Sequence, residues 1–142
     1  MKRVKDTDFF VKKIREVREF EFGFFYYFEG LVISEIHEGV TFSWQMGKRA
    51  IEAAHEIFGK DNPVAYISNR VNSYQVVAKD WSKFYHNRHQ LDFYSVVGNT
   101  QGSFASLVLE RLFFQYGIRQ FSDLEEAITW SLSNIKSRKA SA

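Results

Sequence analysis

The chain has 142 residues, of which 45% are hydrophobic and 25% are charged, and these values are ordinary for one domain with a single core. Its formal net charge is only +2, and the basic residues gather at the two ends, so we expect solvated termini and no nucleic-acid partner. Cysteine is absent, which excludes disulfides, thiolate catalysis and Cys-ligated zinc and is typical of a reducing compartment.

Targeting signals are also missing from the sequence. No apolar run approaches the ~20 residues of a membrane span, and the first residues lack the apolar core of a signal peptide. We therefore predict a cytoplasmic protein without a membrane span. No repeat or linker divides the chain, so we predict a single domain over residues 1–142, with residues 1–18 and 136–142 peripheral or frayed.

The first predicted strand covers residues 20–28. Phenylalanines alternate with glutamates in its first half, and its second half carries large aromatic groups on both faces. Both faces therefore need cover from helices or from a partner. Glu29-Gly30 separates this run from the apolar residues 31–36, and a glycine at the second position of a two-residue loop favours a tight hairpin.

An amphipathic helix is predicted over residues 42–58. Apolar side chains recur there at helical spacing, while lysines and glutamates occupy the other side. Thr41 is the expected N-cap, and Gly59 is expected to end the helix. Residues 64–67 form a short apolar run after a proline, which predicts a buried strand.

The rest of the chain repeats the order of strand and helix. We predict helices over about residues 78–86 and from residue 100 or 103 to 116, strands over residues 91–97 and 118–121, and a final helix that begins with a Ser122/Glu125 capping box. The helix ending at residue 116 is apolar around most of its circumference, which indicates core packing, with a homodimer surface or an acyl-chain pocket as alternatives.

This order predicts the fold class. A strand followed by a helix occurs about four times after an extra first strand. Such an arrangement is typical of an α/β fold in which right-handed crossovers join parallel strands. We therefore predict a mostly parallel sheet of about four β-α units with an extra N-terminal antiparallel strand.

Polar residues crowd the positions directly after the strand over residues 64–67. In open α/β sheets, ligands bind at the carboxyl ends of the strands, so this cluster is the candidate binding site. Backbone N–H groups near a helix start, together with one guanidinium, suit a phosphate, a carboxylate or a peptide. The alternative is that these side chains only satisfy backbone groups of their own loop. The cluster consists of Ser68, Asn69, Arg70, Asn72 and Ser73.

Motifs for catalysis and metal binding are missing. His86 and His89 are three residues apart and His37 lies between two glutamates, but without an H-E-x-x-H spacing we interpret them as solvated or helix-end histidines and predict no metal. The sequence contains no G-x-S-x-G elbow, no P-loop and no G-x-G-x-x-G fingerprint. We therefore predict a protein that is not an enzyme and has no cofactor.

Four segments carry a family resemblance: Glu-Gly-Val-Thr-Phe-Ser-Trp at 38–44, Tyr-Ile-Ser-Asn-Arg at 66–70, Asn-Ser-Tyr at 72–74 and Phe-Ser-Asp-Leu-Glu-Glu-Ala at 121–127. With these segments and the order of its elements, the chain resembles the SpoIIAA-like group, the STAS/SEC14-type small domains related to anti-sigma-factor antagonists. The resemblance covers about residues 20–135. It is closest to the uncharacterised bacterial branch of that group.

The resemblance implies a function. STAS antagonists carry a regulatory serine in an Asp-Ser-Ser-Gly turn after the second parallel strand, and the matching place here is Ser68-Asn69-Arg70, without that aspartate and glycine. Ser68 and Ser73 are therefore phosphorylation candidates. The expected function is a non-catalytic binding or regulatory module that recognises a protein partner or an anionic group. Because Sec14-like relatives are linked to lipid binding, a small carrier of a lipid-like apolar ligand is the alternative.

Overall fold

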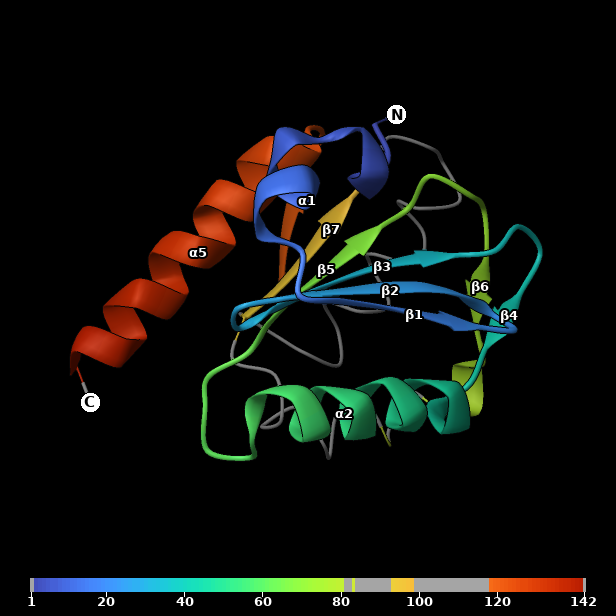
Figure 1. Ribbon diagram of the computed structural model, residues 1–142. Helices are drawn as coiled ribbons and strands as arrows, with labels where there is room; N and C mark the ends of the chain where they lie inside the picture. Colours follow the sequence, from blue (N-terminus) through green and yellow to red (C-terminus); the bar gives the residue numbers. More distant parts are fainter. Residues whose placement is uncertain (1, 81–82, 84–92, 99–117, 142) are drawn as a thin grey trace.

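A computed structural model describes residues 2–80, 83, 93–98 and 118–141 (Figure 1). Its main element is a six-stranded sheet in the order β1-β2-β3-β5-β7-β8. The first three strands are antiparallel neighbours, whereas all pairs from β3 to β8 are parallel. The predicted α/β fold with a mixed, mostly parallel sheet is therefore confirmed. The strands are β1 (Glu16–Phe20), β2 (Gly23–Phe28), β3 (Leu31–Ile36), β5 (Ala65–Asn69), β7 (Phe93–Val97) and β8 (Ile118–Phe121).

The single strand predicted over residues 20–28 is wrong, because β1 and β2 divide this run. Phe20 pairs with Gly23, so Glu21 and Phe22 form a two-residue loop between the strands. The alternation of aromatic residues and glutamates concealed this turn, since Phe22 is as buried as a strand residue would be. A Cβ atom at Gly23 would lie 2.7 Å from the carbonyl oxygen of residue 35 on β3, so the close approach of β2 and β3 requires glycine here.

The hairpin predicted after residue 28 is present. Phe28 pairs with Leu31, and Glu29-Gly30 is the two-residue loop between β2 and β3. Gly30 has a φ of +69°, a left-handed conformation that glycine adopts without the steric penalty of a Cβ atom. This local turn chemistry fixes the register of the two central antiparallel strands.

Helices cover both faces of the sheet (Figure 1). We call the face under α1 (Asp8–Lys13) and α5 (Leu124–Ser141) the α5 side, and the face under α2 (Trp44–Phe58) the α2 side. Alternate strand residues enter two separate cores. On the α5 side, Tyr26, Phe28, Leu31, Ile33, Ile67 and Val97 pack with Leu124, Ala127, Ile128 and Ile135; on the α2 side, Phe25, Tyr27, Val32 and Ile36 pack with Ala50, Ala53, Ala54 and Phe58.

Helix α2 begins later than predicted, and its N-cap is Ser43 instead of Thr41. Thr41 belongs to β4 (Thr41–Phe42), which pairs in parallel with β6 (Gln75–Val76) to form a second, two-stranded sheet. Because that pairing holds residues 41 and 42 extended, the helix starts only at Trp44. Ser43 Oγ accepts the N–H of Met46 at 3.3 Å, and the helix ends before Gly59 as predicted.

The start of α5 also differs from the prediction. Asp123 is the residue before the first helical residue, and its Oδ2 accepts the backbone N–H of Glu126 at 3.2 Å. The predicted Ser122 cap is therefore one position too early. Aspartate and serine are almost equally good N-caps, so residue type alone does not decide whether Ser122 or Asp123 caps the helix.

The N-terminal segment packs against the sheet. It forms a 3-10 turn, η1 (Val4–Asp6), followed by α1, and Val4 and Thr7 are buried. Residues 1–18 were predicted to be peripheral or frayed; Val4 and Thr7 are buried instead, while β1 is the edge strand of the sheet. At the other end, α5 continues through residues 136–140, which are exposed.

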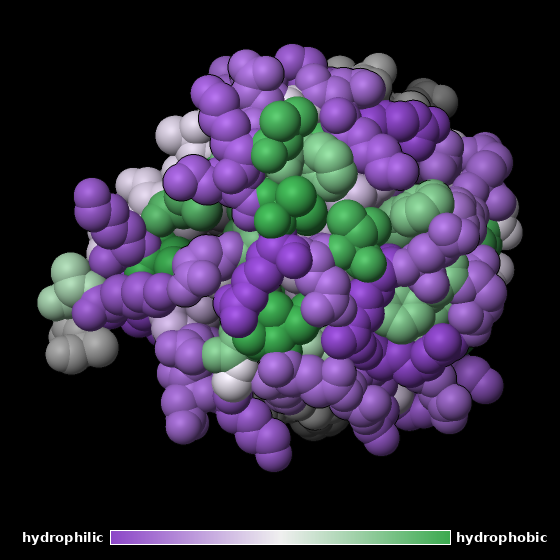
Figure 2. Space-filling view, in the orientation of Figure 1, coloured by the Kyte–Doolittle hydropathy of each residue, from purple (hydrophilic) through white to green (hydrophobic). Residues whose placement is uncertain are grey.

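Several predicted elements lie outside the described residues. These are most of the helix predicted over residues 78–86, of which the 3-10 turn η2 (Ala78–Asp80) is described, the helix ending at residue 116, and the first two residues of the strand predicted over 91–97. On the face shown in Figure 2, apolar patches are broken up by polar side chains. Among the described residues, Val11 and Val17 are the large hydrophobic side chains that are exposed.

Candidate functional site

The predicted site residues divide between the two sides of the sheet. Ser68 and Asn69 are the last residues of β5 instead of loop residues, because this strand ends at residue 69 and not at residue 67. Consecutive strand residues point to opposite faces, so Ser68 and Arg70 lie on the α2 side and Asn69 on the α5 side. All three side chains are buried, with at most 3% of their surface exposed.

On the α2 side, hydroxyl groups bond to one another in pairs. Ser68 Oγ lies 2.8 Å from Tyr74 Oη, and Ser34 Oγ lies 2.5 Å from Tyr66 Oη. Arg70 donates from Nε to Ser68 Oγ at 3.3 Å, and its guanidinium lies 4.9 Å from the centre of the Tyr74 ring. Cation–π contact and hydrogen bonding thus hold Arg70 against the strand end, which agrees with a supporting role.

On the α5 side, Asn69 contacts a buried carboxylate and the N-terminal segment. Asn69 Nδ2 donates to Glu35 Oε2 at 2.8 Å and to the carbonyl oxygen of Lys2 at 3.1 Å. Glu35 Oε2 also accepts the backbone N–H of Val4 at 2.8 Å. Only 3% of the Glu35 surface is exposed, so these amide donors replace the water that a buried carboxylate loses.

Beyond the strand ends, the loops after β3 and β5 are tied together. Asn72 Nδ2 donates to the carbonyl oxygen of Ile36 at 3.0 Å, and the backbone N–H of Ser73 donates to Glu38 Oε2 at 2.7 Å. Gly39 N–H donates to the carbonyl oxygen of Ser73 at 2.8 Å, and the β4–β6 pair continues this contact. Ser73 is exposed, so its hydroxyl is accessible where that of Ser68 is buried.

Burial perturbs two tyrosines of β2. Burial, with the Glu35 charge as the second cause, raises the pKa of Tyr26 to about 12, and burial also raises the pKa of Tyr27. Both phenols therefore remain protonated at neutral pH. Tyr27 Oη donates to the carbonyl oxygen of Ala50 at 3.2 Å, which ties α2 to the sheet.

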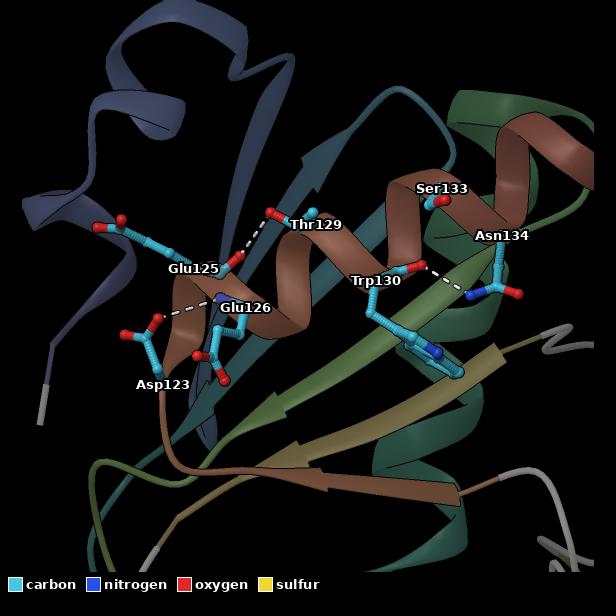
Figure 3. Close-up of a pocket in the computed structure, with 7 residues that line it drawn as sticks. All are labelled: Asp123, Glu125, Glu126, Thr129, Trp130, Ser133 and Asn134. Atoms are coloured by element: carbon cyan, nitrogen blue, oxygen red, sulfur yellow. Dashed lines mark hydrogen bonds between the residues drawn. The ribbon is translucent and has the colours of Figure 1, made fainter.

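A groove of about 460 Å³ lies along the first turns of α5 (Figure 3). Its polar side chains are largely exposed, and its acidic end contacts the N-terminal segment, because Lys2 Nζ lies 2.5 Å from Glu125 Oε1. That hydrogen bond raises the pKa of Lys2 above its usual value. The lining residues are Asp123, Glu125, Glu126, Thr129, Trp130, Ser133 and Asn134.

Metal ligands do not cluster in the part of the chain that the structure describes. No group of three or more His, Asp or Glu residues is placed there to hold a metal ion. His37 packs edge-on against Phe24, with 5.5 Å between the ring centres, and the pair His86/His89 lies outside the described residues.

Sequence reasoning missed Glu35 and Tyr74 as members of these networks. Glu35 did carry a signal, because it is a charged residue within the otherwise apolar run 31–36, and both faces of that run are buried. A carboxylate at such a position needs hydrogen-bond donors, although the sequence does not show where they come from.

No family model, no curated protein and no solved structure matches this chain. The described helices are also too short or too polar for any of them to cross a membrane. The fold places the described residues in the class of α/β domains with a mixed sheet.

Proposed function

We propose that the protein is a non-catalytic binding or regulatory module of the STAS-like class, which recognises a protein partner or an anionic group at the loops after β3 and β5. The order of strands and helices supports this proposal, as do the four sequence segments that resemble the SpoIIAA-like group. Ligands of open α/β sheets bind at the carboxyl ends of the strands, which is where both loops lie.

The observation that carries the proposal is the way these two loops are joined. The β4–β6 pair and the bonds from Ser73 to Glu38 and Gly39 give the loops one defined shape, with Ser73 at the surface. Ser68 and Arg70 are buried where the loop after β5 begins and contact Tyr74, whereas Asn69 is buried on the α5 side. Asn72 and Ser73 belong to the loops themselves. A preformed surface loses little conformational entropy when a partner binds.

Ser73 is the better of the two phosphorylation candidates, because its hydroxyl is exposed and that of Ser68 is buried. A phosphate adds about −1.5 to −2 charge at neutral pH. On Ser73 this charge would lie close to the Glu38 carboxylate, which accepts the N–H of the same residue. Repulsion would open the contact between the loops and release the partner.

A photo-crosslinking experiment tests this proposal. A crosslinking residue replaces Gln75, an exposed residue of β6, in protein expressed in its own cells, and the matched control replaces the exposed Lys136 on α5. We expect a discrete crosslinked partner at position 75 only. Ser73→Asp should reduce the yield about tenfold, whereas Ser73→Ala should leave it unchanged.

Equal crosslinking at both positions, or no effect of Ser73→Asp, would contradict the proposal. Native mass spectrometry of the gently purified protein separates the alternatives, because a retained apolar mass indicates a lipid-like carrier and a doubled protein mass indicates a homodimer. A phosphate mass on the monomer would support phosphorylation at the exposed Ser73.

A further inference from the structure

The N-terminal segment is bound at the end of β5 in the way that a peptide ligand is bound. Two buried side chains contact its main chain: Glu35 accepts the N–H of Val4, and Asn69 donates to the carbonyl oxygen of Lys2. The two side chains therefore bind one backbone N–H and one backbone carbonyl of the segment, on residues 4 and 2. Contacts to the main chain are independent of side-chain identity, and protein domains use them to hold extended peptides.

The side chain of Val4 supplies the selective contact. Its exposed fraction is 0%, and it packs in the core of the α5 side, whereas its neighbours Arg3 and Lys5 are exposed. A pocket for every second side chain, beside main-chain hydrogen bonds, is the usual source of specificity for an extended peptide. This position in the core takes a β-branched residue of the size of valine.

Charge selects the residue two positions before the valine. Lys2 pairs with Glu125 at the acidic end of the groove along α5, and Asp123 and Glu126 line the same groove (Figure 3). A lysine or arginine at this position of a peptide would meet the same carboxylates. The acidic groove therefore favours a basic peptide over an acidic one.

One feature distinguishes this contact from an ordinary part of the core. Helix α1, which follows the segment, has no fully buried residue, and Phe9 and Phe10 pack against β2 at the edge of the core. Asn69 Oδ1, by contrast, is buried and has no hydrogen-bond partner in the described structure, so the site holds a further acceptor that the segment does not use. Buried polar atoms are almost always paired, and a ligand with one more donor would pair this oxygen.

We propose that Glu35, Asn69 and the core position of Val4 form a binding site for a peptide of a protein partner, extended before the position of Val4 and followed by a 3-10 turn. The peptide has a basic residue two positions before a β-branched apolar residue. The chain's own residues 2–4 occupy the site and compete with that peptide. This site lies on the α5 side, away from the exposed Ser73, so either proposal can fail while the other stands.

A competition experiment with the full chain tests this assignment. The probe is a fluorescent synthetic peptide of residues 1–7, Met-Lys-Arg-Val-Lys-Asp-Thr, and fluorescence polarisation measures its binding. Val4→Lys removes the competing anchor, so this variant should bind the probe at least about tenfold more tightly than the wild type. Val11→Lys is the matched control, because Val11 is 75% exposed, and it should bind like the wild type.

Two further changes test the named contacts. Adding Asn69→Leu to the Val4→Lys variant should abolish probe binding, and a probe with lysine in place of valine should not bind. Equal probe affinity for the Val4→Lys variant and the wild type, with both folded by circular dichroism, would overturn the proposal. A wild-type dimer formed by exchange of the segment between two copies would overturn the assignment to a partner.

Hydrogen exchange of the wild type gives a test that does not depend on a variant. We expect the amides of residues 4–7 to exchange by local opening, faster than those of β3, and excess probe to speed their exchange further. If residues 4–7 exchange only together with β3, the segment is an integral part of the fold and the proposal is wrong.

Discussion

Ser68 and Asn69 are neighbours at the end of β5, yet their side chains are satisfied in different ways on the two sides of the sheet. Ser68 bonds to Tyr74, a side chain only 6 residues away, which belongs to the same loop region. Asn69 bonds to Glu35 and to the main chain of the N-terminal segment, 67 residues away. Ser68 is thus satisfied within its own loop region, whereas Asn69 depends on a segment that is distant in the sequence.

This difference suggests different roles for the two sides. The local bond between Ser68 and Tyr74, with Arg70 packed over the Tyr74 ring, gives the loop after β5 a fixed shape. Contacts with the main chain of a terminal segment are exchangeable, because another peptide can offer the same groups. We therefore expect substitutions on the α5 side to change segment docking, and substitutions on the α2 side to change loop order.

The largest effect should come from the anchor of the segment. Val4→Ala removes two methyl groups from a fully buried site and should lower the free energy of unfolding by about 2 kcal/mol. Val11→Ala is the control, because this exposed valine should contribute within about 0.5 kcal/mol. Urea denaturation measures both, and equal effects of the two substitutions would show that Val4 is not an anchor.

The next effect should come from the buried carboxylate. Glu35→Gln keeps the shape of the side chain but replaces a charged acceptor of two amide hydrogens, and it should lower the free energy of unfolding by about 1–2 kcal/mol. The control is Glu29→Gln, whose side chain is 79% exposed and should change little. Hydrogen exchange should rise at residues 4–7 in the Glu35 variant; unchanged protection there would separate Glu35 from segment docking.

On the α2 side, Tyr74→Phe removes the hydroxyl group that bonds to Ser68 and should cost about 1 kcal/mol. Hydrogen exchange should increase in residues 37–43 and 70–77 and not in residues 4–7. Ser68→Ala removes the same bond, so the double variant should be less destabilised than the sum of the two. Strict additivity would contradict a direct bond between these side chains.

The smallest effect at neutral pH concerns Tyr26 on the α5 side. Its pKa is raised to about 12 in the folded chain and is about 10 when unfolded, so the folded state binds the phenolic proton more tightly. The resulting stability is fully present below pH 10 and is lost as the pH rises through about 12. Tyr26→Phe should weaken this loss, measured by denaturation at pH 9 and 11. A tyrosinate absorbance titration that places this phenol near pH 10 would contradict the prediction.

Local patterns in the sequence predicted much of the fold. The Glu29-Gly30 hairpin, the end of α2 at Gly59 and the strand Ile118–Phe121 follow from turn chemistry and from short apolar runs, and the structure confirms each of them. The turn at Glu21-Phe22 escaped prediction because its phenylalanine packs in the core like a strand residue. The pairing of β4 with β6 escaped because each strand has only two residues.

The sequence predicted where the candidate site lies, but not which groups its side chains contact. The rule that ligands bind at the carboxyl ends of strands predicted a site at residues 68–73. Because β5 continues to Asn69, however, adjacent side chains in this stretch point to opposite faces of the sheet. Because the strand was predicted to end two residues too early, the buried strand residues Ser68 and Asn69 were interpreted as loop residues. Such errors are expected because polar residues at a strand end resemble loop residues by type.

The sequence by itself determined the α/β class, the central hairpin and the apolar faces of α2 and α5, because these features depend on residues within a few turns of one another. Only the tertiary structure decided what the polar groups at the end of β5 contact. The partners of Glu35 lie 31 and 34 residues away at Val4 and Asn69, so no local pattern specifies them. A buried carboxylate requires donors, and packing of the whole chain determines which donors reach it.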